Sequence, residues 1–372
     1  MKIAYFVHDL TDPAVERRVR MLRAGGAQLV LLGFRRQAGP VAEVGGVQAI
    51  DLGRTYDSRM AHRAGLALLK TLDPGRWRAM LQGCDVVLAR NLEMLAVAVR
   101  ARDVCAADAR LVYECLDIHR LMLGSGVPRK LLRGLERALL RRCDLLVVSS
   151  PAFIDGYFTP RQHLATPHLL VENKVFDPAG EPRRPSPAVR PPGPPWKIGW
   201  FGVIRCARSL DILTTLARRN PGLVEVVIRG RPALHEFADF EGQVAATPGV
   251  SFEGPYRPAD LAELYGQVHF TWAIDYFDAG LNSAMLLPNR VYEGALNGSV
   301  ALALAGVESG RWVAGRNAGV VMDDPLAETE ALLRGLTPEA YRTLADEVAK
   351  IPVADLAAGP AACAALVESL AA

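Results

Sequence analysis

The stretch SAMLLPNRVYEGALNGSVALALAG, residues 283–306, predicts a loop, a short helix and a strand in that order. Pro288 and Asn289 can begin the helix, and asparagine is one of the residue types preferred at an N-cap. Asn297 and Gly298 are expected to end it, because glycine adopts the left-handed conformation that terminates many helices.

The remainder of this stretch, residues 299–305, is an apolar run typical of a parallel strand that is covered on both faces. Glu293 is therefore a carboxylate in a mostly apolar helix, behind a loop that follows an earlier strand. Open α/β sheets bind ligands at that place.

The same alternation of strands and helices extends outward in both directions from this stretch. Such alternation predicts right-handed βαβ units and parallel sheets, hence an α/β protein. The expected strands cover residues 2–8, 28–34, 85–89, 111–115, 145–149 and 169–172 in the first half, and 196–204, 224–228, 250–252, 270–274, 299–305 and 319–322 in the second.

A proline-rich segment, DPAGEPRRPSPAVRPPGPP at residues 177–195, interrupts this alternation. Proline at that density favours a semi-rigid extended linker rather than a core element. We therefore expect one domain at residues 1–176 and a second at residues 196–352. A C-terminal helix at residues 353–372 is expected to cross back to the first domain.

Composition restricts the class of protein. The chain has 372 residues, 50% hydrophobic and 22% charged, and a net charge of +3, which gives no reason to expect a nucleic-acid partner. The first residues, MKIAYFVHDL, do not resemble a signal peptide, and no apolar run has the length of a membrane helix. The six cysteines form no C-x-x-C pair, which favours a reducing, cytoplasmic compartment.

The segment Pro-Asn-Arg-Val-Tyr-Glu at residues 288–293 resembles the second half of GT-B glycosyltransferases, especially the retaining family 4. The resemblance implies two Rossmann-like parallel-sheet domains that face a central cleft. It implies that Glu293 binds the ribose hydroxyls of a sugar nucleotide, with Asn289 and Arg290 beside it. In that family another glutamate precedes this one by eight residues, and here that position is Met285.

The resemblance also implies a function, the transfer of a sugar from a nucleotide-sugar donor to a glycan acceptor. The expected donor is a UDP-sugar, and the expected acceptor is a lipid-linked precursor of a bacterial exopolysaccharide. No metal and no further cofactor are expected. Two alternatives stay open: a sugar-nucleotide 2-epimerase on the same fold, and a non-catalytic scaffold that binds a nucleotide or a partner, which Met285 favours.

Several residues of the second half are candidates for binding the nucleotide. Arg205 and Arg208 lie in the turn after the strand at residues 196–204, where the family places two cations against the donor diphosphate. Arginine can bind phosphate through a bidentate fork. The remaining candidates lie in two glycine-containing turns that line the base pocket in the family: Gly230, Arg231 and Tyr256.

The loop before the helix supplies candidates for holding the donor sugar. Asn282 and Ser283 have the polar groups to bind sugar hydroxyls, although an ordinary polar loop is the alternative. In the first half, His119 follows a strand at the place where family members contact the donor sugar, and Asp117 precedes it. An inverting enzyme would instead need a general base for the acceptor hydroxyl. The sequence leaves four carboxylates open for that role: Asp9, Asp12, Glu114 and Asp117.

The segment at residues 129–142 predicts a basic amphipathic helix. Its leucines are expected in the core and its arginines on the opposite face. That cationic face is either simply solvated or rests on the anionic inner face of a membrane. The arginines concerned are Arg129, Arg133, Arg137 and Arg141.

Overall fold

The protein is described by a computed structural model that covers residues 1–56, 60–178, 180–185 and 191–372. Part of the predicted linker, residues 179 and 186–190, lies outside the described residues. The chain forms two compact units. Unit 1 comprises Met1–Glu172, Phe176–Glu181 and Ala358–Ala372, and unit 2 comprises Asn173–Val175 and Pro182–Ala357.

Unit 1 is built on an eight-stranded sheet with the order β3-β4-β2-β1-β5-β6-β7-β8. All its neighbouring strands are parallel except β3, which pairs antiparallel with β4. The strand order reverses at the pair β1 and β5. The strands are β1 (Lys2–Val7), β2 (Gln28–Arg35), β3 (Glu43–Val44), β4 (Val47–Arg54), β5 (Val86–Arg90), β6 (Arg110–Cys115), β7 (Leu145–Val148) and β8 (His168–Leu170).

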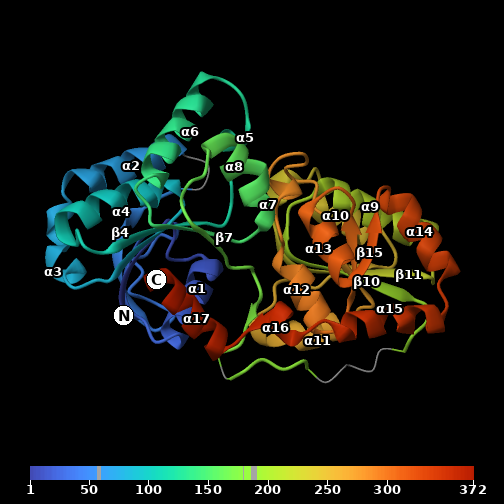
Figure 1. The fold of residues 1–372 in the computed structure, drawn as a ribbon. Helices are drawn as coiled ribbons and strands as arrows, with labels where there is room; N and C mark the ends of the chain where they lie inside the picture. The colour runs from blue at the N-terminus through green and yellow to red at the C-terminus, as the bar shows by residue number, and fades with distance from the viewer. Residues whose placement is uncertain (57–59, 179, 186–190) are drawn as a thin grey trace. The chain divides into compact units, whose positions relative to one another are not determined.

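Helices connect these strands, and the C-terminal helix α17 packs against α1. Gly25 ends α1 and allows this contact, because a Cβ there would lie 2.2 Å from the carbonyl oxygen of Cys363 in α17. In Figure 1 the red α17 lies beside the blue α1. The helices of unit 1 are α1 (Pro13–Ala24), α2 (Met60–Leu72), α3 (Arg78–Leu81), α4 (Leu92–Cys105), α5 (Arg120–Leu123), α6 (Val127–Leu140), α7 (Pro151–Phe153), α8 (Thr159–Gln162) and α17 (Pro360–Ala371).

The expectation of one continuous C-terminal helix is wrong. The segment forms α16 (Val353–Leu356) and then α17, with the short strand β16 (Ala357–Ala358) between them. Gly359 and Pro360 account for the break, because neither residue continues a helix from the preceding turn. The strands β16 and β9 (Val175–Phe176) lie where the chain passes from one unit to the other.

Unit 2 contains a six-stranded parallel sheet with the order β12-β11-β10-β13-β14-β15. This is the order of a dinucleotide-binding fold, and it reverses between β10 and β13. The side chains of Trp196, Trp200 and Trp272 are fully buried around these two strands. The strands are β10 (Trp196–Ile204), β11 (Val224–Pro232), β12 (Val250–Phe252), β13 (Phe270–Trp272), β14 (Val300–Leu304) and β15 (Gly319–Met322).

The helix predicted to begin near Pro288 is present as α12, but Asn289 is its first helical residue rather than its N-cap. Pro288 occupies the N-cap with φ −71° and ψ 146°, an extended conformation that its ring permits. The helices of unit 2 are α9 (Ala207–Arg219), α10 (Phe240–Ala245), α11 (Leu261–Gly266), α12 (Asn289–Leu296), α13 (Glu308–Arg316), α14 (Pro325–Gly335), α15 (Pro338–Lys350) and α16.

The predicted orientation of the basic helix is only partly correct. Arg141 is exposed as expected, and Leu132 and Leu139 are half-buried. Arg129, Arg133 and Arg137 of α6 are half-buried and donate hydrogen bonds to main-chain carbonyl groups. Leu131 and Leu135, expected in the core, are instead 70% and 48% exposed. Arg133 donates to carbonyl oxygens at the end of α5, and Arg137 donates to one in α8. Carbonyl groups in the last turn of a helix lack intrahelical donors and so can accept such bonds.

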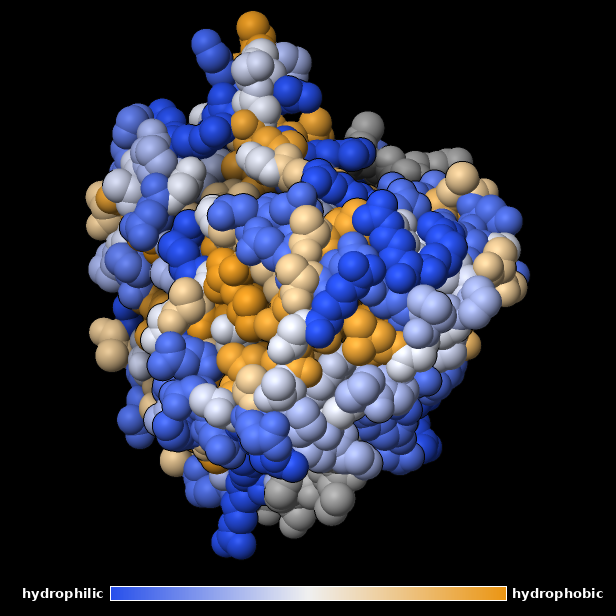
Figure 2. Space-filling model, turned by 90° about the vertical axis from the view of Figure 1, so that its right-hand side faces the viewer, coloured by the Kyte–Doolittle hydropathy of each residue, from blue (hydrophilic) through white to orange (hydrophobic). Residues whose placement is uncertain are grey.

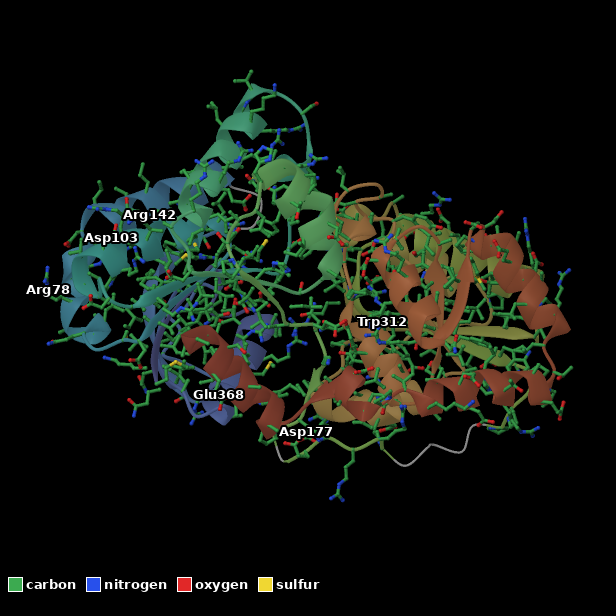
Figure 3. The ribbon with its side chains drawn as sticks, viewed as in Figure 1. Arg78, Asp103, Arg142, Asp177, Trp312 and Glu368 are labelled. Atoms are coloured by element: carbon green, nitrogen blue, oxygen red, sulfur yellow. The ribbon has the colours of Figure 1, made fainter. Side chains whose placement is uncertain are left out.

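The C-terminal end of α6 is held by an ion pair. Arg142 donates to both carboxylate oxygens of Asp103 in α4 at 2.8 Å, and both residues are labelled in Figure 3. No helix in the described parts of the chain has both the length and the apolar character needed to cross a bilayer.

Candidate functional site

The point where the strand order of unit 2 reverses carries two arginines. Arg205 directly follows β10, and its Nη2 lies 3.2 Å from Oδ2 of Asp275 in the loop after β13. The Arg205 guanidinium lies 4.7 Å from the ring centre of Phe277. Arg208, in the first turn of α9, lies 4.1 Å from the ring centre of Tyr276. The structure thus brings both predicted diphosphate-binding arginines to one loop.

Hydrogen bonds join the turn after β10, which carries the two arginines, to the loop after β13. The Sγ atom of Cys206, the N-cap of α9, accepts from the amides of Ser209 and Tyr276 at 3.3 Å each. The Ser209 hydroxyl donates to the carbonyl oxygen of Ile274 at 3.3 Å. Cations at a helix N-terminus are unfavourable, and a bound anion would offset that cost. The arrangement therefore suits a phosphate group.

A second group of side chains surrounds Glu293. The buried Tyr265 hydroxyl donates to its Oε2 at 2.8 Å. Burial, followed by the Glu293 carboxylate, raises the pKa of Tyr256 and of Tyr265, so both phenols stay protonated. Arg290 is buried and donates to the carbonyl oxygen of Trp272 at 3.4 Å. Tyr256, Tyr265, Arg290 and Glu293 thus lie together.

Gly230 has a structural reason to be glycine. Its φ is +139°, and a Cβ there would lie 1.8 Å from the carbonyl oxygen of Gly202, its partner in the β10–β11 register. Close approach of two strands therefore requires it, whether or not a ligand approaches too. Arg231, the next residue, is exposed.

The two residues predicted to hold the donor sugar are buried. Asn282 and Ser283 are 5% and 8% exposed. The Ser283 hydroxyl accepts the amide of Asp278 at 3.1 Å and so braces the loop after β13. Asn289, at the start of α12, is exposed. In this conformation Ser283 holds the loop rather than facing a ligand.

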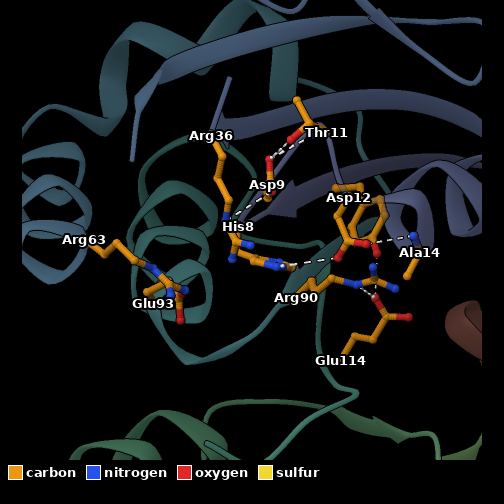
Figure 4. A network of polar contacts seen from close by, with 11 residues as sticks. His8, Asp9, Thr11, Asp12, Ala14, Arg36, Arg63, Arg90, Glu93 and Glu114 are labelled. Carbon is orange, nitrogen blue, oxygen red and sulfur yellow. Dashed lines mark hydrogen bonds and ion pairs between the residues drawn. The ribbon is translucent and has the colours of Figure 1, made fainter. Parts of the chain in front are cut away.

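In unit 1 the reversal of strand order also carries a polar cluster (Figure 4). His8 follows β1, and its Nε2 lies 3.6 Å from Oδ2 of Asp12. Asp12 is also the N-cap of α1, since its side chain accepts the amide of Ala14 at 2.8 Å. Asp9 accepts from both the amide and the hydroxyl of Thr11.

Arginines surround His8. Burial, then Arg90, Arg36 and Arg63, lower its pKa well below the usual value, so the imidazole is neutral. Its Nδ1 is buried and has no hydrogen-bond partner among the described residues. Arg36 pairs with Asp9 at 3.2 Å, and Arg63 pairs with Glu93. The cluster is a network of ion pairs around a neutral histidine.

Glu114, one of the four carboxylates considered as a base, is excluded from that role. It is buried, and it accepts from Arg18 at 2.6 Å, Arg90 at 2.8 Å and Tyr5 at 2.5 Å. Burial alone would raise its pKa, but Arg90 and Arg18 outweigh burial and lower the pKa to about 2. A carboxylate held in this way does not accept a proton near neutral pH.

His119 and Asp117 lie on an exposed turn after β6, and the charges of Arg63 and Glu93 act on His119. The Nδ1 atom of His119 accepts the amide of Leu121 at 3.2 Å and caps α5. Burial of the ring is the largest effect on its pKa, which is lowered and so keeps that nitrogen unprotonated.

Sequence reasoning missed the four residues of unit 1 that converge around the end of β1: His8, Arg36, Arg63 and Arg90. A polar residue at the end of an apolar strand was the available signal for His8 and Arg90. Arg63 belongs to a helix whose place was not predicted. Within the described residues, no group of three or more His, Cys, Asp or Glu side chains has an arrangement that could hold a metal ion.

Comparison with solved structures identifies the fold. The chain matches sucrose-phosphate synthase from Thermosynechococcus elongatus with a TM-score of 0.73 at 15% identity, covering 100% of this chain and 98% of that one. It matches the Anabaena protein HepE, in complex with UDP and glucose, with a TM-score of 0.68 at 14% identity, covering 99% and 98%. No protein-family model matches the chain.

These matches define the class: the chain has the GT-B fold of glycosyltransferases, with two Rossmann-like domains, and this confirms the predicted fold. A curated relative, the succinoglycan biosynthesis protein ExoL of Rhizobium meliloti, is 47% identical over 376 residues, covering 100% of this chain and 93% of the relative. The chain belongs to the ExoL family. The resemblance to GT-B glycosyltransferases of the exopolysaccharide-assembly type is thereby confirmed.

Proposed function

We propose that this chain transfers a hexosyl group from a UDP-sugar to a lipid-linked exopolysaccharide precursor, without a metal, at the cytoplasmic face of a membrane. The observation that carries the proposal is the pair Arg205 and Arg208, fixed over the loop after β13 where the strand order reverses. The 47% identity to a succinoglycan biosynthesis protein supports the acceptor class.

The choice of donor has two supports. HepE, which shares the fold, binds UDP and UDP-glucose. In this chain Glu293 follows the family motif and is half-buried beside Tyr265. A carboxylate can accept two charge-assisted hydrogen bonds from a vicinal diol. We assign Glu293 to the ribose, with Tyr256, Gly230, Arg231, Asn289 and Arg290 as the surrounding nucleotide-side residues.

In the reaction, the bond between the anomeric carbon and the diphosphate oxygen breaks, and the acceptor oxygen forms a bond to that carbon. Negative charge then accumulates on UDP, where Arg205 and Arg208 stabilise it. The proton of the acceptor hydroxyl must leave. The side chains that remain candidates for contact with the sugar or for that proton are Asp9, Asp12, Asp117 and His119. Asn282 and Ser283 are assigned to the sugar loop.

Nucleotide binding tests the proposal first. UDP, GDP, ADP and dTDP are titrated by calorimetry into the wild-type protein, Glu293→Gln and the matched control Glu339→Gln, which alters an exposed carboxylate of α15. We expect UDP to bind best, Glu293→Gln to bind it about tenfold more weakly, and Glu339→Gln to match the wild type.

Turnover separates the proposal from its two rivals. With a UDP-sugar and a lipid-linked acceptor, we expect UDP release that depends on the acceptor. Release of a free or epimerised sugar without acceptor would identify an epimerase. Binding of UDP without turnover on a panel of donors and acceptors would identify a non-catalytic scaffold, and an absence of nucleotide binding would refute the donor assignment.

A further inference from the structure

A cationic cavity of about 420 Å³ lies beside α6, in unit 1. Three of its lining residues come from α6, at positions i, i+3 and i+7, which places them on one face of the helix. The fourth comes from α8. We call it the α6–α8 pocket, and its lining residues are Lys130, Arg133, Arg137 and Arg161.

Main-chain carbonyl groups hold the guanidinium groups of this pocket in place. Arg133 Nη1 donates to the carbonyl oxygens of Met122 and Gly124 at 2.8 Å each. Arg137 Nη2 donates to the carbonyl oxygen of Arg161 at 2.6 Å, and Arg161 itself donates to Leu123. Each guanidinium has five N–H donors, so these bonds orient the groups and leave donors available.

The positive charge of the pocket is not balanced by carboxylates. Among the described residues, none of the four cations forms an ion pair with an acidic side chain. Glu136 of α6 is directed elsewhere, since it accepts from Tyr113, Tyr157 and Gln162 in the core. The Nε atom of Arg137 is buried and has no hydrogen-bond partner within the part of the chain that the structure describes. A phosphate suits such a site, because its oxygens accept pairs of N–H groups.

An exposed apolar face adjoins this pocket on the same helix. Val127, Leu131 and Leu135 follow one another at intervals of four residues and are 69%, 70% and 48% exposed. Apolar side chains also appear at the top of Figure 2, over the part of the molecule that α6 occupies in Figure 1. A helix that exposes large apolar residues next to its arginine and lysine side chains has the pattern of an interfacial membrane helix.

We propose that the α6–α8 pocket binds the phosphate of an anionic phospholipid headgroup while Val127, Leu131 and Leu135 enter the acyl region of the same bilayer. The charge of the pocket selects an anion, and the adjoining apolar face selects a lipid-borne anion over a free one. The inference deepens the proposed function, because a lipid-linked acceptor is presented at a membrane.

Vesicle co-sedimentation of the full chain tests this proposal without donor or acceptor. We expect binding to vesicles of phosphatidylcholine with 30% phosphatidylglycerol and much weaker binding to phosphatidylcholine alone. Arg137→Lys keeps the charge but loses the guanidinium fork, and we expect about fivefold weaker binding. Arg141→Lys, the matched change outside the pocket at the residue directly after α6, should stay within twofold of the wild type. Equal effects of the two changes would overturn the pocket in favour of diffuse charge.

Three further measurements test the proposal without depending on the fold of a single variant or on sugar transfer. Lys130→Gln, whose side chain makes no hydrogen bond to the described residues, should weaken binding about fivefold. Leu131→Asn and Leu135→Asn should each weaken it about tenfold, and no loss would overturn the apolar contribution. Calorimetric binding of glycerol phosphate by a protein that does not co-sediment with the anionic vesicles would show a free-phosphate site and overturn the membrane part. UDP binding needs no vesicle, so the proposed function can fail separately.

Discussion

The guanidinium of Arg205 lies 3.2 Å from the carboxylate of Asp275, across the point where the strand order of unit 2 reverses. Arg205 begins the turn after β10, and Asp275 lies in the loop after β13. The ion pair therefore links the two strand ends that would enclose a ligand. Because Asp275 also accepts the amide of Phe277 at 2.9 Å, it orders the loop and neutralises the arginine at once.

Removing either diphosphate-side arginine should weaken nucleotide binding. We expect Arg205→Gln and Arg208→Gln each to raise the Kd for UDP about tenfold, because each loses a charge-assisted hydrogen bond worth about 1.5–3 kcal/mol. Calorimetric titration at several salt concentrations measures the Kd for UDP of each variant. Arg218→Gln, near the other end of α9, is the matched control and should leave the Kd unchanged; an equal loss there would show an effect of net charge alone.

Neutralising Asp275 should have the opposite effect. Asp275→Asn retains an oxygen that can accept the amide of Phe277. The substituted side chain no longer pairs with the Arg205 guanidinium and no longer repels the diphosphate. We expect a Kd for UDP about two- to fivefold lower, because a half-buried ion pair of this kind is worth about 1 kcal/mol at most. A higher Kd would instead show that Asp275 positions Arg205 for the ligand.

The hydrogen bond between Tyr265 and Glu293 should matter for stability and for binding. Tyr265→Phe removes a buried hydroxyl that donates to a carboxylate, so we expect the unfolding free energy to fall by about 1–2 kcal/mol. The Kd for UDP should rise, since the Glu293 carboxylate loses the contact that orients it. Tyr341→Phe is a matched change at a tyrosine whose hydroxyl donates to the neutral carbonyl oxygen of His269 at 3.5 Å, and it should cost less.

Gly230 provides a test of packing without a ligand. In Gly230→Ala the new Cβ would overlap the Gly202 carbonyl oxygen, and φ is +139°, so we expect loss of soluble folded protein or a destabilisation above about 3 kcal/mol. Gly254→Ala has φ +74° and open space around the Cβ, so about 1–2 kcal/mol is expected. Urea midpoints compare them, and equal midpoints would contradict the strand contact.

Glu114 should control the acid stability of unit 1. Its pKa is lowered to about 2, so its stabilising effect is complete above its ordinary pKa of 4.5 and is lost as the pH falls towards 2. Glu114→Gln leaves Arg18 and Arg90 buried without a countercharge, and we expect a cost of about 3–5 kcal/mol at pH 7. The stability of this variant should also vary less between pH 5 and pH 2 than that of the wild type.

A surface ion pair gives the matched control for that prediction. Asp103→Asn removes the contact with the 42% exposed Arg142, and a cost below about 1 kcal/mol is expected. If Glu114→Gln costs no more than Asp103→Asn in urea denaturation, the buried network contributes nothing special to unit 1.

The sequence by itself determined the parallel α/β pattern, the position of most strands, and the arginines and glutamate that follow strand ends in unit 2. These features depend on local periodicity and on residue types at strand and helix ends, which a linear sequence records directly. The relation of Glu293 to Tyr265, 28 residues earlier, depended on α11 and α12 meeting in space.

Only the tertiary structure decided which partners those residues have. Glu114, a candidate base in the sequence, is held by Arg18 and Arg90 from two other elements. Leu131 and Leu135 of α6 are exposed although the sequence pattern placed them in the core, while Arg133 and Arg137 turn inward and donate to main-chain carbonyl groups of neighbouring segments. An amphipathic pattern identifies two faces, but the neighbours packed against a helix decide which one is buried.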